Sequence, residues 1–415
     1  MASNLREKAA TSSASTLSDG LDALIDGVKT AAAAGTPIAI RGGVTKAWYG
    51  HRVEGVALDV RGHSGIVDYE PSELVLVARA GTPLREVEAL LAENRQMLAF
   101  EPPHFSPAPG SGLPLAGDDS ISRATTAATR GATLGGCVAT GLSGPRRMAA
   151  GSVRDFVLGV RMIDGRGQPL AFGGKVMKNV AGYDVSRALT GSLGTLGVLT
   201  EMSLKVLPLP AQTVTLSFTL DEAAALLTLN QWAGLPIAIT ASAWRSRASE
   251  GGGYAARGGR LLVRLEGSEA AVQSGIRRIG GLDVEPGEAE AAWAGMREQT
   301  DHFFASRAVD APLWRIALPP TAPPLDADAL GFPDQLIEWG GALRWIATHA
   351  DAPTIRDAAT RLGGHATLWR ASEDIKTLHG VFTPLSAPLL AIHRRLKAEF
   401  DPARLFNRGR LYPDL

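Results

Sequence analysis

Residues 37–46 have the sequence P-I-A-I-R-G-G-V-T-K. The first five residues are short and rich in β-forming types, which predicts a strand that ends at Arg41. Gly42 and Gly43 follow directly, and consecutive backbone N–H groups freed by glycine form a concave site for an anion. Arg41 and Lys46 add positive charge. The stretch therefore suits a diphosphate, although a plain glycine turn between two strands is an equal alternative.

Two more glycine-rich blocks follow along the chain. The first comprises T-L-G-G at 133–136, G-L-S-G at 141–144 and G-S-V-R-D at 151–155; the second comprises K-N-V-A-G-Y-D at 178–184, then Gly191, Gly194 and Gly197. Each block alone is explained by turns or tight packing. Three blocks in order over about 160 residues point instead to one long cofactor that meets the backbone at several places.

The rest of the chain mixes helical and strand patterns. Helical spacing of apolar residues occurs at 21–32 and 82–91, short β-rich runs at 56–60, 65–69 and 74–80, and half-buried alternation at 198–206. Residues 161–172 predict a hairpin, because Asp164-Gly165 is a two-residue turn signal. The class is therefore α+β or α/β.

The domain limits are predicted from the chain length and from proline-rich stretches. At about 150 residues per domain, 415 residues suggest two or three domains. Leu207–Pro210 is rich in proline and predicts a boundary. Residues 211–385 carry seven of the eight tryptophans, which suggests a second core or a broad contact surface, and 387–400 predict a final helix. We expect a disordered extension at 1–16, a first domain at 17–210, a second at 211–385 and a C-terminal segment at 386–415.

Composition excludes several classes of protein. Lys plus Arg (42) equals Asp plus Glu (42), so no overall field attracts nucleic acid or an acidic membrane surface. Cys137 is the only cysteine, so the chain holds neither an intramolecular disulfide nor a cysteine-ligated iron–sulfur or zinc site of its own. There is no secretory signal and no run of about 18 apolar residues. We expect a cytoplasmic protein with no metal site, no nucleic-acid partner and no direct membrane insertion.

The short motifs of several enzyme classes are absent. There is no P-loop, no H-E-x-x-H and no G-x-S-x-G. Gly251, Gly253 and Ala256 fit G-x-G-x-x-A, but no strand precedes them and no acidic residue stands where a dinucleotide site needs one. Neither a hydrolase nor a Rossmann site is predicted.

The glycine blocks taken together resemble a known family. The order R-G-G-x-T-K, T-L-G-G, G-S-V-R-D-F-V-L-G, K-N-V-A-G-Y-D and G-x-L-G-V-L-T-E is similar to the FAD-binding domain of the vanillyl-alcohol oxidase and p-cresol methylhydroxylase superfamily. E-P-P-H at 101–104, L-W-R-I at 313–316, W-G-G-A-L-R-W at 339–345 and F-T-P-L-S-A-P at 382–388 resemble the FAD-binding E subunits of bacterial glycolate oxidases. The likeness extends from Leu17 to nearly the end of the chain.

The resemblance implies an α+β architecture and a cofactor. A two-lobed FAD-binding domain of the p-cresol methylhydroxylase type would carry an α+β cap domain with an antiparallel sheet, and the C-terminal segment would return to the FAD-binding domain. The diphosphate would lie on Arg41, Gly42, Gly43, Val44, Thr45, Lys46, Thr133, Leu134, Gly135, Gly136, Gly141, Leu142 and Ser143. The ribose and adenine would lie along Ser152, Arg154, Asp155, Gly197 and Val198, and the flavin near Asn407.

The chain departs from the family pattern at three places. Members that tether the flavin often carry His in the glycine loop, but this loop has Val44, Thr45 and Lys46, so we expect non-covalent FAD. Arg408 replaces the proline of the usual N-P-G-R ending, which alters that turn. Residues 107–130 form an insertion beside the ligand blocks, where they could affect ligand access or partner contact.

Three side chains are candidates for catalysis on a small 2-hydroxy acid. His365 can exchange a proton near neutrality, although a hydrogen-bonded structural histidine is at least as good an interpretation. Arg315 and Arg344 can each bind a carboxylate through two parallel hydrogen bonds. Each adjoins a tryptophan, Trp314 and Trp345, so a guanidinium stacked on an indole at the surface is the simpler interpretation.

The resemblance implies an FAD-binding subunit of a glycolate oxidase complex, which oxidises glycolate to glyoxylate by hydride transfer to flavin. A second flavoprotein subunit and an iron–sulfur subunit would be its partners, and association with the inner membrane would come only through them. Two alternatives stay open. The chain could be a self-sufficient FAD-dependent 2-hydroxy-acid dehydrogenase, or a non-catalytic FAD-binding scaffold that docks the other subunits.

Overall fold

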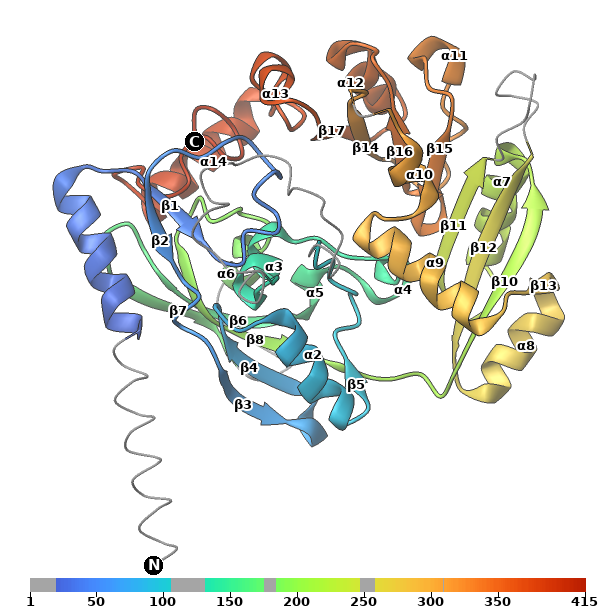
Figure 1. Cartoon of the computed structure of the whole chain (residues 1–415), viewed down its shortest axis with the longest axis horizontal. Helices are drawn as coiled ribbons and strands as arrows, with labels where there is room; N and C mark the ends of the chain where they lie inside the picture. The colour runs from blue at the N-terminus through green and yellow to red at the C-terminus, as the bar shows by residue number, and fades with distance from the viewer. Residues whose placement is uncertain (1–19, 106–130, 175–183, 247–257, 309) are drawn as a thin grey trace, which may run out of the picture.

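The computed structural model describes residues 20–105, 131–174, 184–246, 258–308 and 310–415. The predicted extension at 1–16, the whole insertion at 107–130 and the K-N-V-A-G-Y part of the third glycine block lie outside the described residues. Figure 1 shows the described chain as two halves, one with the N-terminal helix and β1–β9 and one built on a larger sheet.

The elements alternate along the whole chain. The strands are β1 (Ile38–Arg41), β2 (Val56–Asp59), β3 (Ile66–Glu70), β4 (Val75–Arg79), β5 (Gln96–Met97), β6 (Val157–Ile163), β7 (Pro169–Gly173), β8 (Val198–Lys205), β9 (Leu207–Pro208), β10 (Gln212–Leu220), β11 (Ile239–Ser246), β12 (Gly259–Gly267), β13 (Leu282–Asp283), β14 (Leu313–Ala317), β15 (Gln335–Glu338), β16 (Leu343–Ala347) and β17 (His365–Arg370). The helices are one at 20–34, then α2 (Leu84–Glu93), α3 (Leu134–Thr140), α4 (Arg147–Ala150), α5 (Val153–Phe156), α6 (Val185–Leu189), α7 (Glu222–Ala233), α8 (Glu269–Ile279), α9 (Pro286–Glu298), α10 (His302–Ser306), α11 (Ala327–Leu330), α12 (Ala352–Arg361), α13 (Glu373–His379) and α14 (Ala387–Phe400), with short 3-10 turns at Pro71–Glu73 and Trp339–Gly341.

The first lobe is built from both ends of the described chain. β1 and β2 pair in parallel, and the helix at 20–34 packs Leu24 and Val28 against Ile38. Gly35 ends that helix with φ at +62°, a conformation that glycine adopts without strain. Phe406 then bridges to Ile38 on the other side, so the C-terminal segment extends the small sheet.

The second lobe is a five-stranded antiparallel sheet in the order β3-β4-β8-β6-β7. Helices α2, α3, α5 and α6 cover one of its faces (Figure 1). Leu84, Val138 and Leu189 of these helices form one buried core with Leu76 and Met202 of the sheet. Burial of this apolar surface is what holds α3, and therefore the second glycine block, in place.

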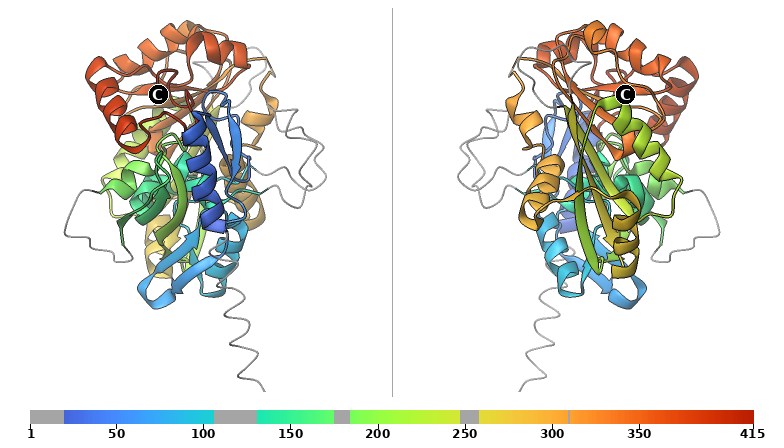
Figure 2. Two further views of the ribbon diagram at one scale, coloured as in Figure 1. Left: turned by 90° about the vertical axis from the view of Figure 1, so that its left-hand side faces the viewer. Right: turned by 90° about the vertical axis from the view of Figure 1, so that its right-hand side faces the viewer.

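The other half is an eight-stranded antiparallel sheet in the order β13-β10-β12-β11-β15-β16-β14-β17. Helices α7, α8 and α12 cover one face, as the two side views of Figure 2 help to show. Helices α9 and α10 lie on the other face, which also packs against Trp48, Tyr49 and Phe105 of the first half. Antiparallel sheets with helices on their faces make an α+β fold, as the sequence predicts.

The structure confirms several helices and strands predicted from the sequence. The hairpin at 161–172 is β6–β7, the alternating segment at 198–206 is β8, and the final helix at 387–400 is α14. The chain leaves the five-stranded sheet at the end of β8 and enters the eight-stranded sheet at β10. The domain limits at residues 17, 210 and 385 stay predictions.

A buried ion pair fixes the return of the chain to the first lobe. Lys397 and Asp401 lie 2.8 Å apart, and their side chains are 4% and 0% exposed. Asp401 also accepts hydrogen bonds from the backbone N–H groups of Leu405 and Phe406, and Lys397 Nζ donates to the carbonyl oxygen of Thr195. These contacts set the path of the chain after α14.

We expect Asp401→Ala to lower the free energy of unfolding by about 3–5 kcal/mol, because Lys397 is left buried without its partner. Urea unfolding followed by circular dichroism measures the change. Asp414→Ala is the matched control, since its ion pair with Arg394 has side chains 65% and 56% exposed and contributes at most about 1 kcal/mol. Equal losses in the two variants would contradict this account of the C-terminal segment.

Candidate functional site

A cavity of about 100 Å³, here named the glycine pocket, lies where β1, α3 and the C-terminal segment meet. It is lined by residues 40–47 together with Val60, Ala80, Thr133, Gly135, Gly136, Ala139, Thr140, Leu193, Gly194, Gly197, Leu199, Asn407 and Arg410.

Glycine allows the loop after β1 to approach the second lobe. A Cβ atom at Gly43 would collide with the carbonyl oxygen of Gly131, and one at Gly42 would lie 2.7 Å from Thr133 Oγ1. No other residue fits at Gly43 unless the backbone moves. Val44 has φ at +60°, a left-handed conformation that is strained for a β-branched residue. The loop therefore holds a shape that local preferences alone do not select.

The same loop presents backbone donors to the pocket. Of the residues that the structure describes, none accepts a backbone hydrogen bond from the N–H groups of residues 42–45. Successive free N–H groups in a loop that includes a left-handed residue form a concave nest for an anion. This donor set fits the diphosphate of FAD.

Lys46 adds a buried positive charge. Its side chain is 6% exposed and its Nζ donates to the carbonyl oxygen of His104 at 3.5 Å. Burial lowers the pKa of Lys46 to about 8, and the nearby Glu298 opposes this shift. Glu298 itself pairs with Arg297, and within the described ranges no carboxylate forms an ion pair with Lys46. A bound anion would supply the missing negative charge.

Arg410 adds a second cation from the C-terminal segment. Its guanidinium donates to the carbonyl oxygens of Tyr49 and Lys46 at 3.3 and 3.1 Å. Burial lowers the pKa of Arg410 to about 10, and the charge of Arg41 adds to the shift. The pocket wall therefore combines free N–H groups with a buried cation, Lys46, and a half-buried one, Arg410, which are the groups that bind phosphate oxygens.

The structure brings most of the predicted diphosphate residues together. The predicted residues that line the glycine pocket are Arg41, Gly42, Gly43, Val44, Thr45, Lys46, Thr133, Gly135, Gly136, Gly197 and Asn407. Those outside it are Leu134, Gly141, Leu142, Ser143, Ser152, Arg154, Asp155 and Val198. The cofactor contacts themselves stay predictions for all of these residues.

Local packing explains why several of the predicted residues lie outside the glycine pocket. Leu134 and Val198 are wholly buried in hydrophobic cores, so only their backbone could meet a ligand. Ser152 and Asp155 form the capping box of α5, in which the carboxylate of Asp155 accepts from the N–H and hydroxyl of Ser152 at 2.8 and 2.9 Å. Arg154 is exposed beside them, and Gly141 caps α3 with φ at +65°.

Sequence analysis missed Arg410, Thr140 and Leu193 on this pocket. Arg410 carries a signal that could have found it, because it closes the N-R-G-R run that begins at Asn407. Thr140 and Leu193 carry none, since a threonine near a helix end and a leucine in a glycine-rich turn are common in any fold.

A smaller cavity of about 30 Å³, here named the arginine pocket, lies against the eight-stranded sheet. It is lined by Pro103, Phe105, Leu142, Ser143, Gly144, Pro145, Met296, Arg297, Gln299, Arg315, Glu338, Trp339, Leu343, Trp345 and Trp369. Lys46 stands between the two cavities, because it lines the glycine pocket and its Nζ lies 5.6 Å from the centroid of the Phe105 ring. Two of the predicted diphosphate residues, Leu142 and Ser143, thus face the arginine pocket.

Strand alternation separates the two candidate arginines. Arg315 pairs with Trp345 across β14 and β16, so both side chains point to the face that meets the first half. Arg344 points to the opposite face, where it is wholly buried and donates to the carbonyl oxygens of Ala322 and Pro323 at 2.7 and 2.6 Å. Its guanidinium holds a loop behind the sheet and lines neither pocket, so the structure adds no support to the prediction that Arg344 is catalytic.

Arg315 faces the arginine pocket among three indoles. Its guanidinium carbon lies 5.2, 5.9 and 5.7 Å from the ring centroids of Trp339, Trp345 and Trp369. The sequence suggested contact with the neighbouring Trp314 at the surface, whereas Arg315 lies in a cavity among three other indoles. Burial lowers the pKa of Arg315 below its ordinary value. No carboxylate in the described part of the chain forms an ion pair with it.

His365 lies at the rim of the same sheet face. It pairs with Ala317 of β14, two residues beyond Arg315, but its side chain is exposed and lines neither pocket. Partial desolvation of the ring, together with the charge of Arg315, lowers the pKa of His365. The catalytic role of His365 stays a prediction.

Glu338 is the acidic group of the arginine pocket, and sequence analysis missed it. Its side chain is buried and its Oε2 accepts a hydrogen bond from Trp345 Nε1 at 2.7 Å. Burial raises the pKa of Glu338 to about 7, against the opposing effects of Trp345 and Arg315. No signal in the sequence marks this residue, because its property comes from burial rather than from a motif.

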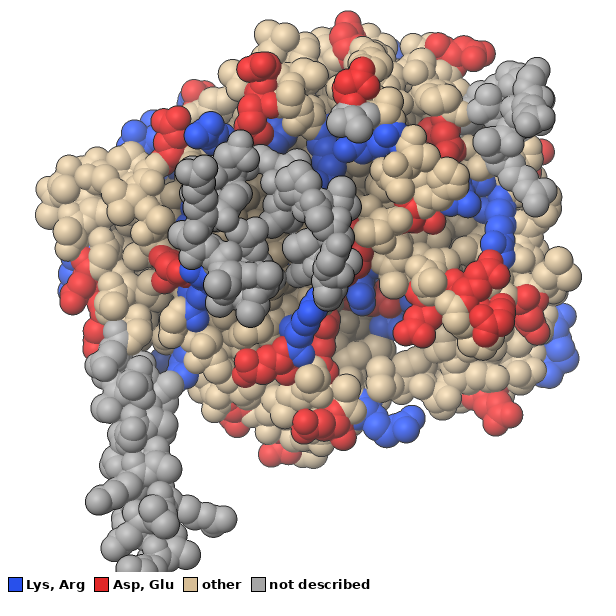
Figure 3. All heavy atoms as spheres, viewed as in Figure 1, with Lys and Arg blue, Asp and Glu red and all other residues tan. Residues whose placement is uncertain are grey.

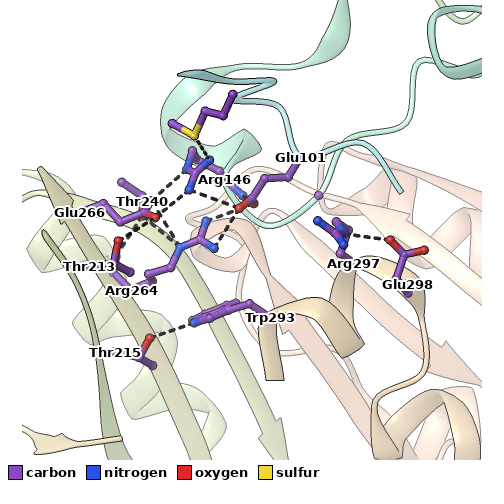
Figure 4. A network of polar contacts seen from close by, with 12 residues as sticks. Glu101, Arg146, Thr213, Thr215, Thr240, Arg264, Glu266, Trp293, Arg297 and Glu298 are labelled. Atoms are coloured by element: carbon purple, nitrogen blue, oxygen red, sulfur yellow. Dashed lines mark hydrogen bonds and ion pairs between the residues drawn. The ribbon is translucent and has the colours of Figure 1, made fainter. Parts of the chain in front are cut away.

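A ring of four charges joins the two halves of the molecule (Figure 4). Arg146 pairs with Glu266 at 2.7 Å, and Arg264 pairs with Glu101 at 2.9 Å. The contacts between Arg146 and Glu101 and between Arg264 and Glu266, each 3.4 Å, close the ring. The side chains are 6–15% exposed, so loss of any one would leave a buried charge unpaired.

The loop at 101–105 is held at its other end by α9. The carboxylate of Glu298 accepts hydrogen bonds from the N–H groups of His104 and Phe105 at 3.1 and 2.7 Å. His104 Nε2 lies 3.0 Å from a carboxylate oxygen of Glu88. This loop, which carries Phe105 into the arginine pocket, is therefore positioned by both halves of the molecule.

The described residues contain neither a candidate metal site nor a candidate membrane-spanning helix. No group of three or more His, Cys, Asp or Glu there could hold a metal ion. None of the described helices is long and apolar enough to cross a membrane. Figure 3 shows positive and negative side chains interspersed on the visible face.

Comparisons relate this chain to known proteins along its whole length. Residues 19–118 match the family described as FAD binding domain. The chain is 43% identical over 397 residues to glycolate oxidase subunit GlcE of Escherichia coli (strain K12), which covers 96% of this chain and 99% of that protein. It is 40% identical over 84 residues to glycolate oxidase subunit GlcD of Bacillus subtilis (strain 168), 20% of this chain and 18% of that protein.

Solved structures show the same architecture. An alkyldihydroxyacetonephosphate synthase superposes with a TM-score of 0.59 at 16% identity, covering 93% of this chain and 75% of that one. At this identity the likeness shows the fold alone. The predicted two-lobed FAD-binding fold with an α+β cap is thus confirmed, and the match at 19–118 confirms FAD as the predicted cofactor.

We expect Gly43→Ala to lower the amount of FAD retained per chain at least tenfold after gel filtration, because the added methyl group meets the Gly131 carbonyl and displaces the nest. The absorbance ratio of flavin to protein measures retention. Gly62→Ala is the matched control, since a Cβ at Gly62 has nothing within 4 Å. Equal FAD content in the two variants would refute the role of the loop.

Glu338 makes stability depend on pH. Its pKa is 4.5 as an ordinary glutamate and about 7 in the fold. Between these values the folded state binds more protons than the unfolded state, so the free energy of unfolding falls by about 3 kcal/mol as pH rises from about 4.5 to 7. In urea unfolding, Glu338→Gln should become more stable relative to the parent protein between pH 5 and pH 8. A constant difference across this range would contradict the prediction.

Proposed function

Because the chain belongs to the family of glycolate oxidase subunits represented by GlcE, we propose that it is the FAD-binding E subunit of a glycolate oxidase complex. In this function glycolate is oxidised to glyoxylate and the electrons pass to partner subunits. The end-to-end match to the Escherichia coli subunit is the observation that carries the proposal.

We assign the FAD diphosphate to the N–H groups of residues 42–45, with Lys46 and Arg410 neutralising its charge. The bound flavin supplies a two-electron acceptor for the hydride that leaves the substrate. Val44 and Thr45 stand where flavin-tethering members of the superfamily often carry His, so we propose that FAD is held without a covalent bond. The side of the pocket near Asn407 and Lys46 is where we place the flavin ring.

The two electrons on the flavin must then leave, either to a partner subunit or directly to a quinone. Cys137 is the only cysteine of the chain and is buried, and burial raises the pKa of its thiol to about 12. One inert thiol cannot ligate an iron–sulfur cluster. We therefore propose an iron–sulfur subunit and a second, GlcD-like flavoprotein subunit as partners, with any membrane association passing through them.

A self-sufficient 2-hydroxy-acid dehydrogenase is the second candidate function. It is favoured by the occurrence of the glycine pocket and the arginine pocket in one chain, since cofactor and acid then need no second subunit. A scaffold without cofactor is disfavoured, because the glycine loop retains its free donors and both cations.

The absorption spectrum of the purified chain, recorded anaerobically before and after glycolate is added, tests the proposal. We expect oxidised-flavin bands that glycolate bleaches and that acetate, which lacks the hydroxyl group, leaves unchanged. Bands that bleach only after GlcD-like and iron–sulfur subunits are added would assign reduction to the complex. A colourless chain that added FAD cannot restore would contradict the cofactor assignment.

A further inference from the structure

We propose that the arginine pocket is a two-point site for a small 2-hydroxy acid, in which Arg315 binds the carboxylate and Glu338 accepts a hydrogen bond from the 2-hydroxyl group. The proposal deepens the function given above and rests on it for the class of ligand. The choice of these two residues rests on the contacts within the pocket.

Arg315 is the cation of this pocket that is left for a ligand. The other arginine of the lining, Arg297, pairs with Glu298 at 2.8 Å. Arg147, just outside the lining, stacks on Trp339 at 4.3 Å and lies at the surface. Because indole faces surround Arg315, water competes weakly there and a two-hydrogen-bond contact with a carboxylate gains strength.

The indole N–H groups around Arg315 are already used by the protein. Trp339 donates to the carbonyl oxygen of Gly144, Trp345 donates to Glu338, and Trp369 donates to the side-chain oxygen of Gln299, at 3.1, 2.7 and 2.9 Å. The hydroxyl of Ser143 accepts from a backbone N–H at 3.2 Å. The three tryptophans therefore offer a ligand apolar faces only. Arg315 and Glu338 are the charged groups that are left for it, beside the hydroxyl hydrogen of Ser143 and the amide NH2 of Gln299.

Glu338 has one carboxylate oxygen to offer. Its Oε2 accepts from Trp345, whereas no described residue donates a hydrogen bond to its Oε1. The other acidic groups that act on Glu338 are satisfied elsewhere, since Asp301 pairs with Arg245 at 3.1 Å and Glu101 with Arg264 at 2.9 Å. A hydroxyl group is a suitable partner for Oε1, whereas a second carboxylate would be repelled. The site therefore favours a hydroxy monocarboxylate over a dicarboxylate.

The place of the pocket fits this ligand, and its volume of about 30 Å³ restricts the ligand to the smallest acids. The pocket adjoins the glycine pocket across Lys46 and Phe105. An acid held by Arg315 and Glu338 would thus lie at the junction of the two halves, next to the cavity assigned to FAD.

Calorimetric titration of the FAD-saturated full chain with glycolate and with acetate, under anaerobic conditions, tests the proposal. The two acids differ by the hydroxyl group. We expect glycolate to bind at least tenfold more tightly than acetate at pH 8, where Glu338, with its pKa of about 7, is mostly ionised and accepts a strong hydrogen bond from the hydroxyl group. Flavin absorbance recorded in the same samples reports reduction separately, so failure of this site and failure of the proposed function are distinguishable.

Variants test the contacts of Arg315 with the carboxylate and of Glu338 with the hydroxyl group separately. Arg315→Gln should weaken both acids at least tenfold, and Arg315→Lys should weaken both while retaining the charge. Glu338→Gln should lower the glycolate-to-acetate preference severalfold, because Trp345 takes the amide oxygen and the amide NH2 then faces the pocket. Arg260→Gln is the matched control, since Arg260 forms an exposed pair with Glu288 far along the sheet on β12.

Equal affinities of the parent chain for glycolate and acetate would overturn the proposal. So would glycolate binding by Arg315→Gln that is as tight as binding by Arg260→Gln. A Glu338→Gln variant that keeps the full preference for glycolate would remove Glu338 from the site.

Discussion

Asn407 is the side chain on which the glycine pocket depends. Its Oδ1 accepts a hydrogen bond from the N–H of Ile40 at 2.9 Å, its Nδ2 donates to the carbonyl oxygen of Leu193 at 2.7 Å, and its own N–H donates to the carbonyl oxygen of Ile38. It is 2% exposed and lines the pocket. One amide thus joins the strand before the glycine loop, the turn of the third glycine block and the C-terminal segment.

This constraint explains why the two ends of the described chain must meet. β1 has only β2 as a full partner, and the C-terminal segment supplies the other edge through Phe406. The ion pair of Lys397 and Asp401 brings that segment back after the eight-stranded sheet, and the ring of four charges at the junction holds the sheet against the loop at 101–105. Both pockets lie between parts of the chain that are far apart in sequence.

Sequence reasoning succeeded where one residue type alone satisfies a local requirement. The place of Gly43 at the pocket could be predicted, because only glycine allows the close contact with Gly131. A run of such glycines indicates a ligand that binds close to the backbone. Sequence reasoning could not place side chains whose position depends on the register between strands. Arg315 and Arg344 look alike beside their tryptophans, and only the pairing of β14 with β16 places one in a pocket and the other behind the sheet. The role of Glu338 could not be predicted from the sequence, since its raised pKa comes from burial.

The central claim is that FAD lies in the glycine pocket with its diphosphate on the loop after β1. The crystal structure of the FAD-saturated chain tests this most directly. We predict diphosphate oxygens within hydrogen-bond distance of the N–H groups of residues 42–45, and the flavin ring on the side of Asn407 and Lys46. Density for FAD elsewhere, or a diphosphate that does not contact this loop, would contradict the account.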